Sequence, residues 1–275
     1  MSAVAGARES LAVVHLVWAP LGPTVLERFI SSYRDHEAGV EHRLLVLLNG
    51  FAPNQDLTPW TRALGGVEHE QLRLAQPVLD LAAYREAVER LPAERYVFVN
   101  SFSVIRGENW LGALDAQLSA PHVGVVGTAG SWESAYSGAP RPLRPFRRGF
   151  DPFPNPHIRT NGFAMTRELL RSLEWRAPGT KLQAWELESG RRGLSRQVAD
   201  HGLAMLVVGR DGIAYPPERW RESETFRSGE QANQLIADNR TEEYARASPR
   251  RRVQLERLTW GLRTDGQPAP AVAER

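Results

Sequence analysis

The stretch Leu11–Trp18 (LAVVHLVW) decides the fold, because it is apolar at almost every position. A short run that is apolar on both faces predicts a strand buried on both sides, which is typical of parallel sheets. We therefore expect a central sheet built from this run and from others like it. Those others are Leu44–Leu48, Tyr96–Val99, Val123–Val126 and Leu203–Val208.

Segments with helical periodicity lie between these strands. Thr24–His36, Leu81–Leu91 and Asn109–Leu118 place apolar residues three to four positions apart. Strands that alternate with helices predict an α/β domain with a mostly parallel central sheet flanked by helices. Further helices are predicted at Thr166–Leu173, about Trp185–His201, Glu230–Ala247 and Arg250–Trp260.

Prolines interrupt this rhythm between Gly130 and Asn161, which predicts a long loop of a kind often found at functional sites. We expect one α/β domain over residues 1–248. Residues 249–275 are expected to form a basic amphipathic segment followed by a flexible tail, Thr264–Arg275.

The composition excludes several classes of function. The 275-residue chain has no cysteine, which rules out thiolate nucleophiles, iron–sulfur clusters and disulfides. Lys181 is the only lysine among 34 basic residues, and Thr180 precedes it, so the sequence has no phosphate-binding P-loop. The formal net charge is +2, and the arginines are scattered among 32 acidic residues, which argues against a nucleic-acid partner.

The sequence also lacks patterns that indicate membrane insertion, secretion or a dinucleotide cofactor. No apolar run approaches the roughly 18 residues of a membrane-spanning helix, and Met1–Glu9 lacks the features of a secretory signal, so we expect a cytoplasmic protein. No Gly-x-Gly-x-x-Gly motif follows a strand, which disfavours a dinucleotide cofactor.

Polar and aromatic residues follow the predicted strands, where ligands bind in open α/β sheets. Because the carboxyl ends of parallel strands share one edge of the sheet, we expect these side chains to face a common ligand. They are Trp18, Asn49, Asn100, Ser101, Phe102 and Ser103.

The order of these parts resembles the A-type glycosyltransferase fold, particularly the family 2 glycosyltransferases. In that family a second strand ends in a polar residue, here Asn49, and an acidic and aromatic segment follows, here Asp80–Tyr84 (DLAAY). A later strand leads into a metal-binding motif, here Asn100–Ser103, and a segment ending in Trp-Leu, here Asn109–Leu111. The resemblance covers about residues 12–210.

This resemblance implies transfer of a sugar, with inversion, from a nucleotide-sugar donor to a hydroxyl acceptor on a glycan or a lipid-linked molecule. It also divides the domain into a nucleotide-binding half of about residues 10–128 and an acceptor half of about residues 129–248.

The sequence departs from the family at the metal motif. Aligned by the strand, the two aspartates of the family fall on Asn100 and Phe102, and Ser103 takes the next acidic position. Magnesium and manganese prefer carboxylate oxygens, so we expect no divalent metal cofactor. Two explanations remain open: a metal-independent transferase, and a catalytically silent module that binds a nucleotide sugar or a glycan.

Without a metal, arginine must offset the charge that develops on the leaving diphosphate. Arg159 is the first candidate for this role, followed by Arg219 and Arg227. The alternative is that Arg159 pairs with a surface acid.

Inverting members of the family use a carboxylate near the start of a helix to take the proton of the acceptor hydroxyl. Glu188 is the first candidate and Glu186 the second, because the resemblance also runs through Glu188–Gln197. Two residues apart on a helix, they differ by about 200° and cannot both face one site. The alternative is that both merely favour a helix N-terminus.

The resemblance places Asn49 and Asp80 against the nucleotide base and ribose, whereas Asp80 alternatively caps the helix that follows it. Tyr84 either stacks on the ligand or belongs to the core. In the acceptor half, Trp132 either stacks on a sugar or anchors a lid, and His157 either binds phosphate or acceptor or is structural. The full set of candidates for acceptor contacts is Trp132, Glu133, His157 and Asn161.

Two segments near the end of the domain allow two interpretations each. Phe226–Asn233 either closes over the acceptor or begins a helix. Arg250–Trp260 either touches an anionic surface at the inner membrane or packs back on the domain. The sequence indicates no oligomeric state.

Overall fold

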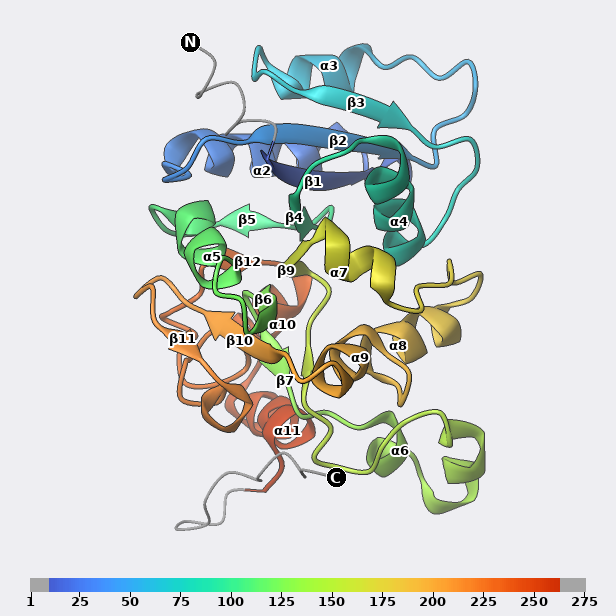
Figure 1. Ribbon diagram of the computed structural model, residues 1–275, viewed down its shortest axis with the longest axis vertical. Coiled ribbons are helices and arrows are strands. Elements are labelled where there is room, and N and C mark those ends of the chain that lie inside the picture. Colours follow the sequence, from blue (N-terminus) through green and yellow to red (C-terminus); the bar gives the residue numbers. More distant parts are fainter. Residues whose placement is uncertain (1–9, 263–275) are drawn as a thin grey trace.

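The computed structural model describes residues 10–262 of the chain. Its centre is an eight-stranded sheet in the order β11-β10-β6-β9-β4-β1-β2-β3, covered by helices on both faces (Figure 1). The predicted α/β fold with a mostly parallel sheet flanked by helices is confirmed. The strands of the sheet are β1 (Leu11–Trp18), β2 (Arg43–Asn49), β3 (Glu70–Arg73), β4 (Arg95–Val99), β6 (Val123–Gly127), β9 (Gly162–Thr166), β10 (Ala204–Val208) and β11 (Ala214–Tyr215).

β1 lies inside the sheet and pairs in parallel with β2 and β4. Its side chains alternate between two cores, so that Ala12 and Val14 pack on one face and Leu11 and Val13 on the other. This double burial explains why the run is apolar throughout rather than alternating.

Sequence reasoning missed three strands of this sheet, β3, β9 and β11, and β9 matters most for the site. It runs antiparallel between β4 and β6 and pairs with both. Only five residues long, it follows directly on the proline-rich loop, so its pattern does not stand out from that loop. Its position brings the end of the loop, immediately before Gly162, to the carboxyl end of β4.

Two sets of helices cover the sheet. The core on one face contains residues of α2 (Pro23–Asp35), α3 (Thr58–Leu64) and α5 (Trp110–Leu118). The other core contains residues of α4 (Asp80–Arg90), α7 (Arg167–Ser172), α8 (Lys181–Ser189) and α9 (Leu194–Asp200).

The single helix expected over about Trp185–His201 is wrong, because α8 ends at Ser189 and α9 begins at Leu194. Gly190 and Gly193 make the break. A Cβ atom at Gly190 would lie 2.5 Å from a backbone oxygen of Glu186, so only glycine fits this close turn.

The helix expected over Glu230–Ala247 is also wrong. Helix α10 spans only Asn239–Ala245, and the side chain of Asp238 accepts hydrogen bonds from the backbone N–H groups of Arg240 and Thr241 at its start. Before it, β12 (Ile236–Ala237) pairs with β5 (Val104–Ile105). Tertiary pairing and a strong N-cap therefore override the helical pattern of the preceding residues.

Short elements occupy the proline-rich stretch and the turns around it. They are β7 (Gly130–Ser131), α6 (Ala135–Gly138), the 3₁₀ helix η2 (Arg141–Arg147), β8 (His157–Ile158), and the 3₁₀ helices η1 (Ala19–Leu21) and η3 (Pro217–Arg219).

Helix α11 (Pro249–Trp260) ends the described chain, and it packs back on the domain through Leu255, Thr259 and Trp260. The tail predicted at Thr264–Arg275 lies outside the described residues. Within residues 10–262, no helix combines the length and apolar character that spanning a bilayer requires.

His15 is a buried histidine in the middle of β1. Its ring stacks on Phe29 at 3.7 Å between centroids, and neither ring nitrogen has a hydrogen-bond partner. Burial lowers its pKa from the ordinary value of 6.5 to about 3. The ring is therefore neutral in the folded protein over most of the pH range in which the unfolded chain takes up a proton.

We expect His15 to make the fold sensitive to acid. Below pH 6.5 the unfolded chain binds the proton and the folded chain does not, so stability falls as the pH drops towards about 3. The loss is on the order of 4 kcal/mol. A His15→Leu variant should lose much less stability than the wild type between about pH 7 and about pH 4, measured by urea unfolding. Equal losses in both proteins would show that other groups govern the acid response.

Candidate functional site

The candidate site lies at the carboxyl edge of the sheet, where the loop before α4 and the end of the proline-rich stretch meet. The Asn49 side chain, at the end of β2, donates a hydrogen bond to the Val78 carbonyl and accepts one from the Val78 N–H, at 2.8 and 3.1 Å. These two hydrogen bonds fix the loop that leads to Asp80. From the other side, the Asn161 carbonyl accepts a hydrogen bond from the Asn100 N–H, which ties the end of the stretch to β4.

Glu188 stands in the last turn of α8, not near a helix start as expected. The backbone N–H and the hydroxyl of Thr160 both donate hydrogen bonds to its Oε1, at 2.9 and 3.1 Å. Its Oε2 lies 3.9 Å from the Arg159 guanidinium. Burial favours the neutral acid, but Arg159, His157 and the Thr160 donors outweigh it and lower the pKa of Glu188. The carboxylate is therefore ionised and held in a fixed orientation.

Arg159 reaches this carboxylate from the segment that follows β8. Its guanidinium carbon lies 5.5 Å from the centroid of the Phe226 ring, and its buried Nε has no hydrogen-bond partner. Burial disfavours its charged form, but the surrounding carboxylates, Glu188 first, outweigh burial and raise its pKa. Arg159 is thus a permanent cation with an unused donor, and its ion-pair partner is Glu188 at the site, not a surface acid.

Asp80 is the third charged member of the cluster. It is the first residue of α4, and the position before it, Leu79, is the N-cap. Its Oδ1 accepts a hydrogen bond from the N–H of Leu81 at 3.0 Å. Burial, with the negative charge of Glu188, raises the pKa of Asp80. Two neighbouring carboxylates thus have pKa values shifted in opposite directions, a pattern typical of sites that handle protons.

His157 and Asn161 flank Arg159 in sequence and are both buried. The His157 Nδ1 lies 2.8 Å from the Asn155 carbonyl, and burial lowers the pKa of its ring. The side-chain amide of Asn161 has no hydrogen-bond partner on either its oxygen or its nitrogen. A buried amide without partners is costly in a folded protein, so this group marks the site as a place where a ligand can contribute bonds.

The end of β4 does not suit a divalent cation. The Oδ1 of Asn100 already accepts hydrogen bonds from the Phe102 N–H at 2.9 Å and the Ser103 hydroxyl at 3.3 Å. Phe102 offers no donor atom, and in the part of the chain that the structure describes no group of three His, Asp or Glu residues could hold a metal. Asn100–Ser103 therefore offers no carboxylate oxygen to a divalent cation.

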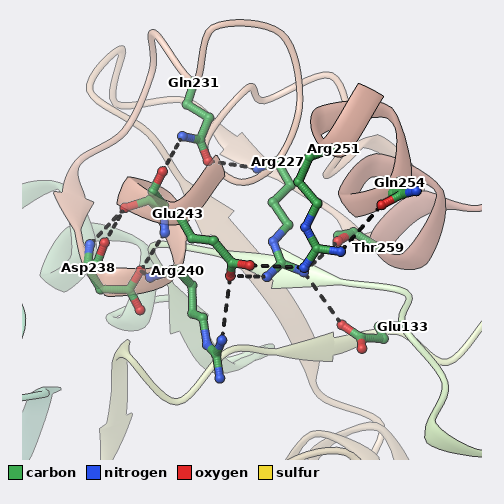
Figure 2. Close-up of polar contacts among 10 residues, drawn as sticks. Glu133, Arg227, Gln231, Asp238, Arg240, Glu243, Arg251, Gln254 and Thr259 are labelled. Carbon is green, nitrogen blue, oxygen red and sulfur yellow. Dashed lines mark hydrogen bonds and ion pairs between the residues drawn. The ribbon is translucent and has the colours of Figure 1, made fainter. Parts of the chain in front are cut away.

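A charged network adjoins the cluster and involves Arg227 (Figure 2). Its guanidinium lies 3.9 Å from Glu133 and 3.4 Å from Glu243, and its guanidinium carbon is 5.0 Å from the centroid of the Phe226 ring. Phe226 therefore contacts two arginines, Arg159 and Arg227. Burial is the largest influence on Arg227 and lowers its pKa.

The segment that carries Phe226 and Arg227 has an unusual backbone. Glu224, Arg227 and Gln231 have φ values of 50°, 44° and 52°, which residues other than glycine rarely adopt. The Gln231 side chain bridges the Arg227 N–H and the Thr241 carbonyl, which holds the strained turn (Figure 2). This segment is not the start of a helix, and such concentrated strain is common at functional sites.

Several candidates lie apart from the cluster. Tyr84 is fully buried in the core, in line with the second of its two interpretations. Trp132 is buried as well, with its Nε1 donating to the Pro217 carbonyl and its ring edge-on to Trp260 at 5.3 Å, so the protein itself encloses the ring. Glu186 points towards Gly149, away from Glu188.

Trp18, Ser101 and Arg219 also lie apart from the charged cluster. Trp18 covers Gly50 and, with Ser101, lines a closed space next to His15. Arg219 pairs with Glu222 on the surface. Sequence reasoning missed Thr160 as a member of the site, although Thr160 lies within the stretch 156–162. It named Phe226 only as the first residue of a segment with two interpretations, closure over the acceptor or a helix start.

The largest hollows lie away from this cluster. One of about 1290 Å³ is lined mainly by residues 92–95 and 166–168, at the start of β4 and the end of β9. Another of about 680 Å³ is lined by residues 37–44 and 67–70, at the amino-terminal edge of β2. The closed space next to Glu188 measures only about 10 Å³, the size of one water molecule. The charged cluster is the better candidate site, because it lies at the carboxyl edge of the sheet, where ligands bind in open α/β sheets.

Comparison with solved structures identifies the fold. A mannosyltransferase, PcManGT from Pyrobaculum calidifontis, described in complex with GDP-Man and Mn²⁺, matches 79% of this chain with a TM-score of 0.51 and 13% identity. Glucosyl-3-phosphoglycerate synthase from Mycobacterium tuberculosis, described with Mn²⁺, UDP and glucosyl-3-phosphoglycerate, matches 62% of the chain with a TM-score of 0.40 and 19% identity. This chain covers 60% and 61% of the lengths of those two proteins.

No protein-family model matches the sequence, and no curated protein does. The structural likeness therefore establishes the fold and not the activity. The chain has the α/β fold of the A-type glycosyltransferases.

Proposed function

We propose that the protein is an inverting, metal-independent glycosyltransferase that moves a sugar from a nucleotide-sugar donor to a hydroxyl acceptor. The observation that carries this proposal is the convergence of Glu188, Arg159 and Asp80 at the carboxyl edge of an A-type sheet. In an open α/β sheet, that edge is where ligands bind.

In this proposal Arg159 binds the donor diphosphate. Its unused Nε–H is a donor for a phosphate oxygen, and its charge offsets the charge that builds up as the diphosphate leaves. Asp80 faces the nucleotide, and Asn49 acts indirectly, because both ends of its amide already hold the loop before α4. The turn Asn100–Ser103 shapes the floor of the donor site.

Glu188 takes the proton of the acceptor hydroxyl. The hydroxyl oxygen forms a bond to the anomeric carbon while the bond from that carbon to the diphosphate breaks, and the electron pair leaves with the diphosphate. The proton passes to Oε2 of Glu188, because Oε1 is engaged by Thr160. With its lowered pKa this carboxylate is a weak base, so it accepts the proton only once attack on the sugar has made the hydroxyl acidic.

The acceptor is proposed to bind beside Glu133, His157 and Asn161, on a glycan or a lipid-linked molecule. The unpaired amide of Asn161 supports this, since a sugar hydroxyl can both donate to and accept from it. This assignment implies a site of action in the cytoplasm, at the inner membrane surface when the acceptor is lipid-linked.

The donor site is tested by thermal unfolding in the presence of UDP, GDP, TDP or CMP, each with EDTA or with manganese. We expect one nucleotide to raise the melting temperature equally in both conditions, because a ligand present at 100 times its Kd adds about 2.7 kcal/mol to the stability of the folded state. A rise that requires manganese would contradict metal independence. No rise with any nucleotide would contradict the donor site.

A second function is favoured by the same lowered pKa of Glu188. A carboxylate with two hydrogen-bond donors and an arginine nearby is also suited to holding a ligand hydroxyl without reaction. The second candidate is thus a catalytically silent module that binds a nucleotide sugar or glycan. The two functions differ in whether Glu188 is needed for turnover.

A further inference from the structure

Two large apolar side chains project from the 3₁₀ helix η2 into solvent. Leu143 is 52% exposed and Phe146 is 77% exposed. A 3₁₀ helix has three residues per turn, so residues three apart lie in one row along it. Leu143 and Phe146 therefore form a single apolar row.

Two arginines of η2, Arg144 and Arg147, face the domain. The Arg144 guanidinium lies over the ring of Tyr136 at 5.7 Å, and that of Arg147 lies over Trp185 at 5.2 Å. These cation–π contacts hold Arg144 and Arg147 against the domain and leave Leu143 and Phe146 outermost. This is the reverse of the arrangement that water alone would favour for a surface helix.

The segment is strongly and uniformly positive. Arg141–Arg148 (RPLRPFRR) contains four arginines and no acid. Within residues 10–262 none of the four forms an ion pair, whereas Arg251 and Arg252 of α11 pair with Glu243 and Glu230. Arg141 and Arg148 are both exposed, so their charge is available to an external anion.

Further exposed apolar residues lie at the same end of the molecule. The Phe153 N–H donates to the Ser137 hydroxyl on α6, and its ring lies against Gly261 at the end of α11. Phe153 and the neighbouring Leu262 are both exposed. Figure 1 shows α6 and α11 towards one end of the long axis, and η2 contacts α6, so these residues lie at the same end as η2.

We propose that this end of the molecule, led by η2, docks on an anionic lipid bilayer. Leu143 and Phe146 enter the boundary between headgroups and acyl chains, and the arginines of Arg141–Arg148 contact lipid phosphates. A second copy of the chain is a poor occupant, because a symmetric interface would bring two uniformly positive segments together. The inference does not depend on the proposed catalytic function.

The test is sedimentation of the full chain with vesicles of phosphatidylcholine mixed with phosphatidylglycerol, compared with vesicles of phosphatidylcholine alone. We expect binding to the anionic vesicles that weakens as salt is raised. The double variant Leu143→Ser with Phe146→Ser should bind at least about tenfold more weakly, since two exposed apolar side chains lose their burial in lipid. Arg141→Gln with Arg148→Gln should weaken binding about tenfold at low salt.

Matched controls separate η2 from the rest of the surface. Ile213→Ser removes an apolar side chain that is 51% exposed in a turn elsewhere, and Arg171→Gln with Arg176→Gln removes two exposed arginines elsewhere. Both should bind like the wild type. Equal weakening in the controls, no binding to anionic vesicles, or unchanged binding of the η2 variants would overturn the proposal.

A probe at η2 itself gives a second readout. Because the chain has no cysteine, Leu143→Cys introduces a unique thiol that can carry an environment-sensitive fluorophore. We expect its emission to shift to the blue on anionic vesicles, while the same dye on Ile213→Cys does not shift. A shift on Ile213→Cys alone would assign the contact to another surface. Vesicle binding of the double variant Val253→Ser with Leu258→Ser, at two exposed positions of α11, tests whether that helix also contacts the bilayer.

Discussion

A Glu188→Gln variant is expected to lose sugar transfer by about 100- to 10,000-fold, the usual contribution of a positioned general base. Glutamine keeps an oxygen that can accept both hydrogen bonds from Thr160, so α8 and the neighbouring turn stay in position. It cannot take a proton, and it removes the negative charge beside Arg159. Nucleotide binding, measured by thermal shift, should be retained, because the substituted group contacts the acceptor.

Glu186→Gln is the matched control, since Glu186 lies on the same helix and points towards Gly149. It should transfer sugar at nearly the wild-type rate. Comparable turnover in wild type and Glu188→Gln would assign the proton to another group, of which Asp80 with its raised pKa is the first to examine. Absence of turnover in the wild type, with nucleotide binding intact, would favour the silent binding module.

The largest expected effect on stability comes from Trp260→Ala. Trp260 is only 3% exposed, and its ring packs edge-on against Trp132. Its Nε1 donates a hydrogen bond to the Arg227 carbonyl, which connects α11 to the strained segment beside the site. Removing the ring should cost about 3–5 kcal/mol in the free energy of unfolding, measured with urea.

Two variants at the end of α11 separate the causes of this loss. Trp260→Phe keeps most of the ring volume but not the hydrogen-bond donor, so it should cost less than Trp260→Ala while still loosening the turn at Arg227. Leu258→Ala, at a position that is 44% exposed on the same helix, should cost little. If Trp260→Ala were as stable as Leu258→Ala, α11 would not be part of the cooperative core.

The central strands could be predicted from sequence because burial on both faces leaves a clear apolar signature. Leu11–Trp18 has the same bounds in the structure as in the prediction. The errors lie where tertiary contacts decide. The break at Gly190–Gly193 depends on the close approach of backbone segments, and β9 depends on two neighbours, β4 and β6, that are distant in sequence.

The candidate site, too, could be predicted only in part from the sequence. Glu188, Arg159 and Asp80 were candidates from residue type, chain order and the family resemblance. That they lie close together follows from β9, which returns the chain to β4. The role of Thr160 could not be predicted, because a threonine that orients a carboxylate from a loop has no pattern of its own. The burial of Trp132 could not be predicted either, because exposed and buried tryptophans look alike in a loop sequence.

The antiparallel position of β9 between β4 and β6 also affects how the chain folds during its synthesis. During synthesis, β1, β2, β3 and β4 leave the ribosome before β9, and so does β6, but the sheet order joins β6 to β4 only through β9. Until Thr166 emerges, both β4 and β6 have an unpaired edge, which is a template for aggregation. The two halves of the sequence are thus not independent folding units: the second half supplies the strand that closes the sheet of the first.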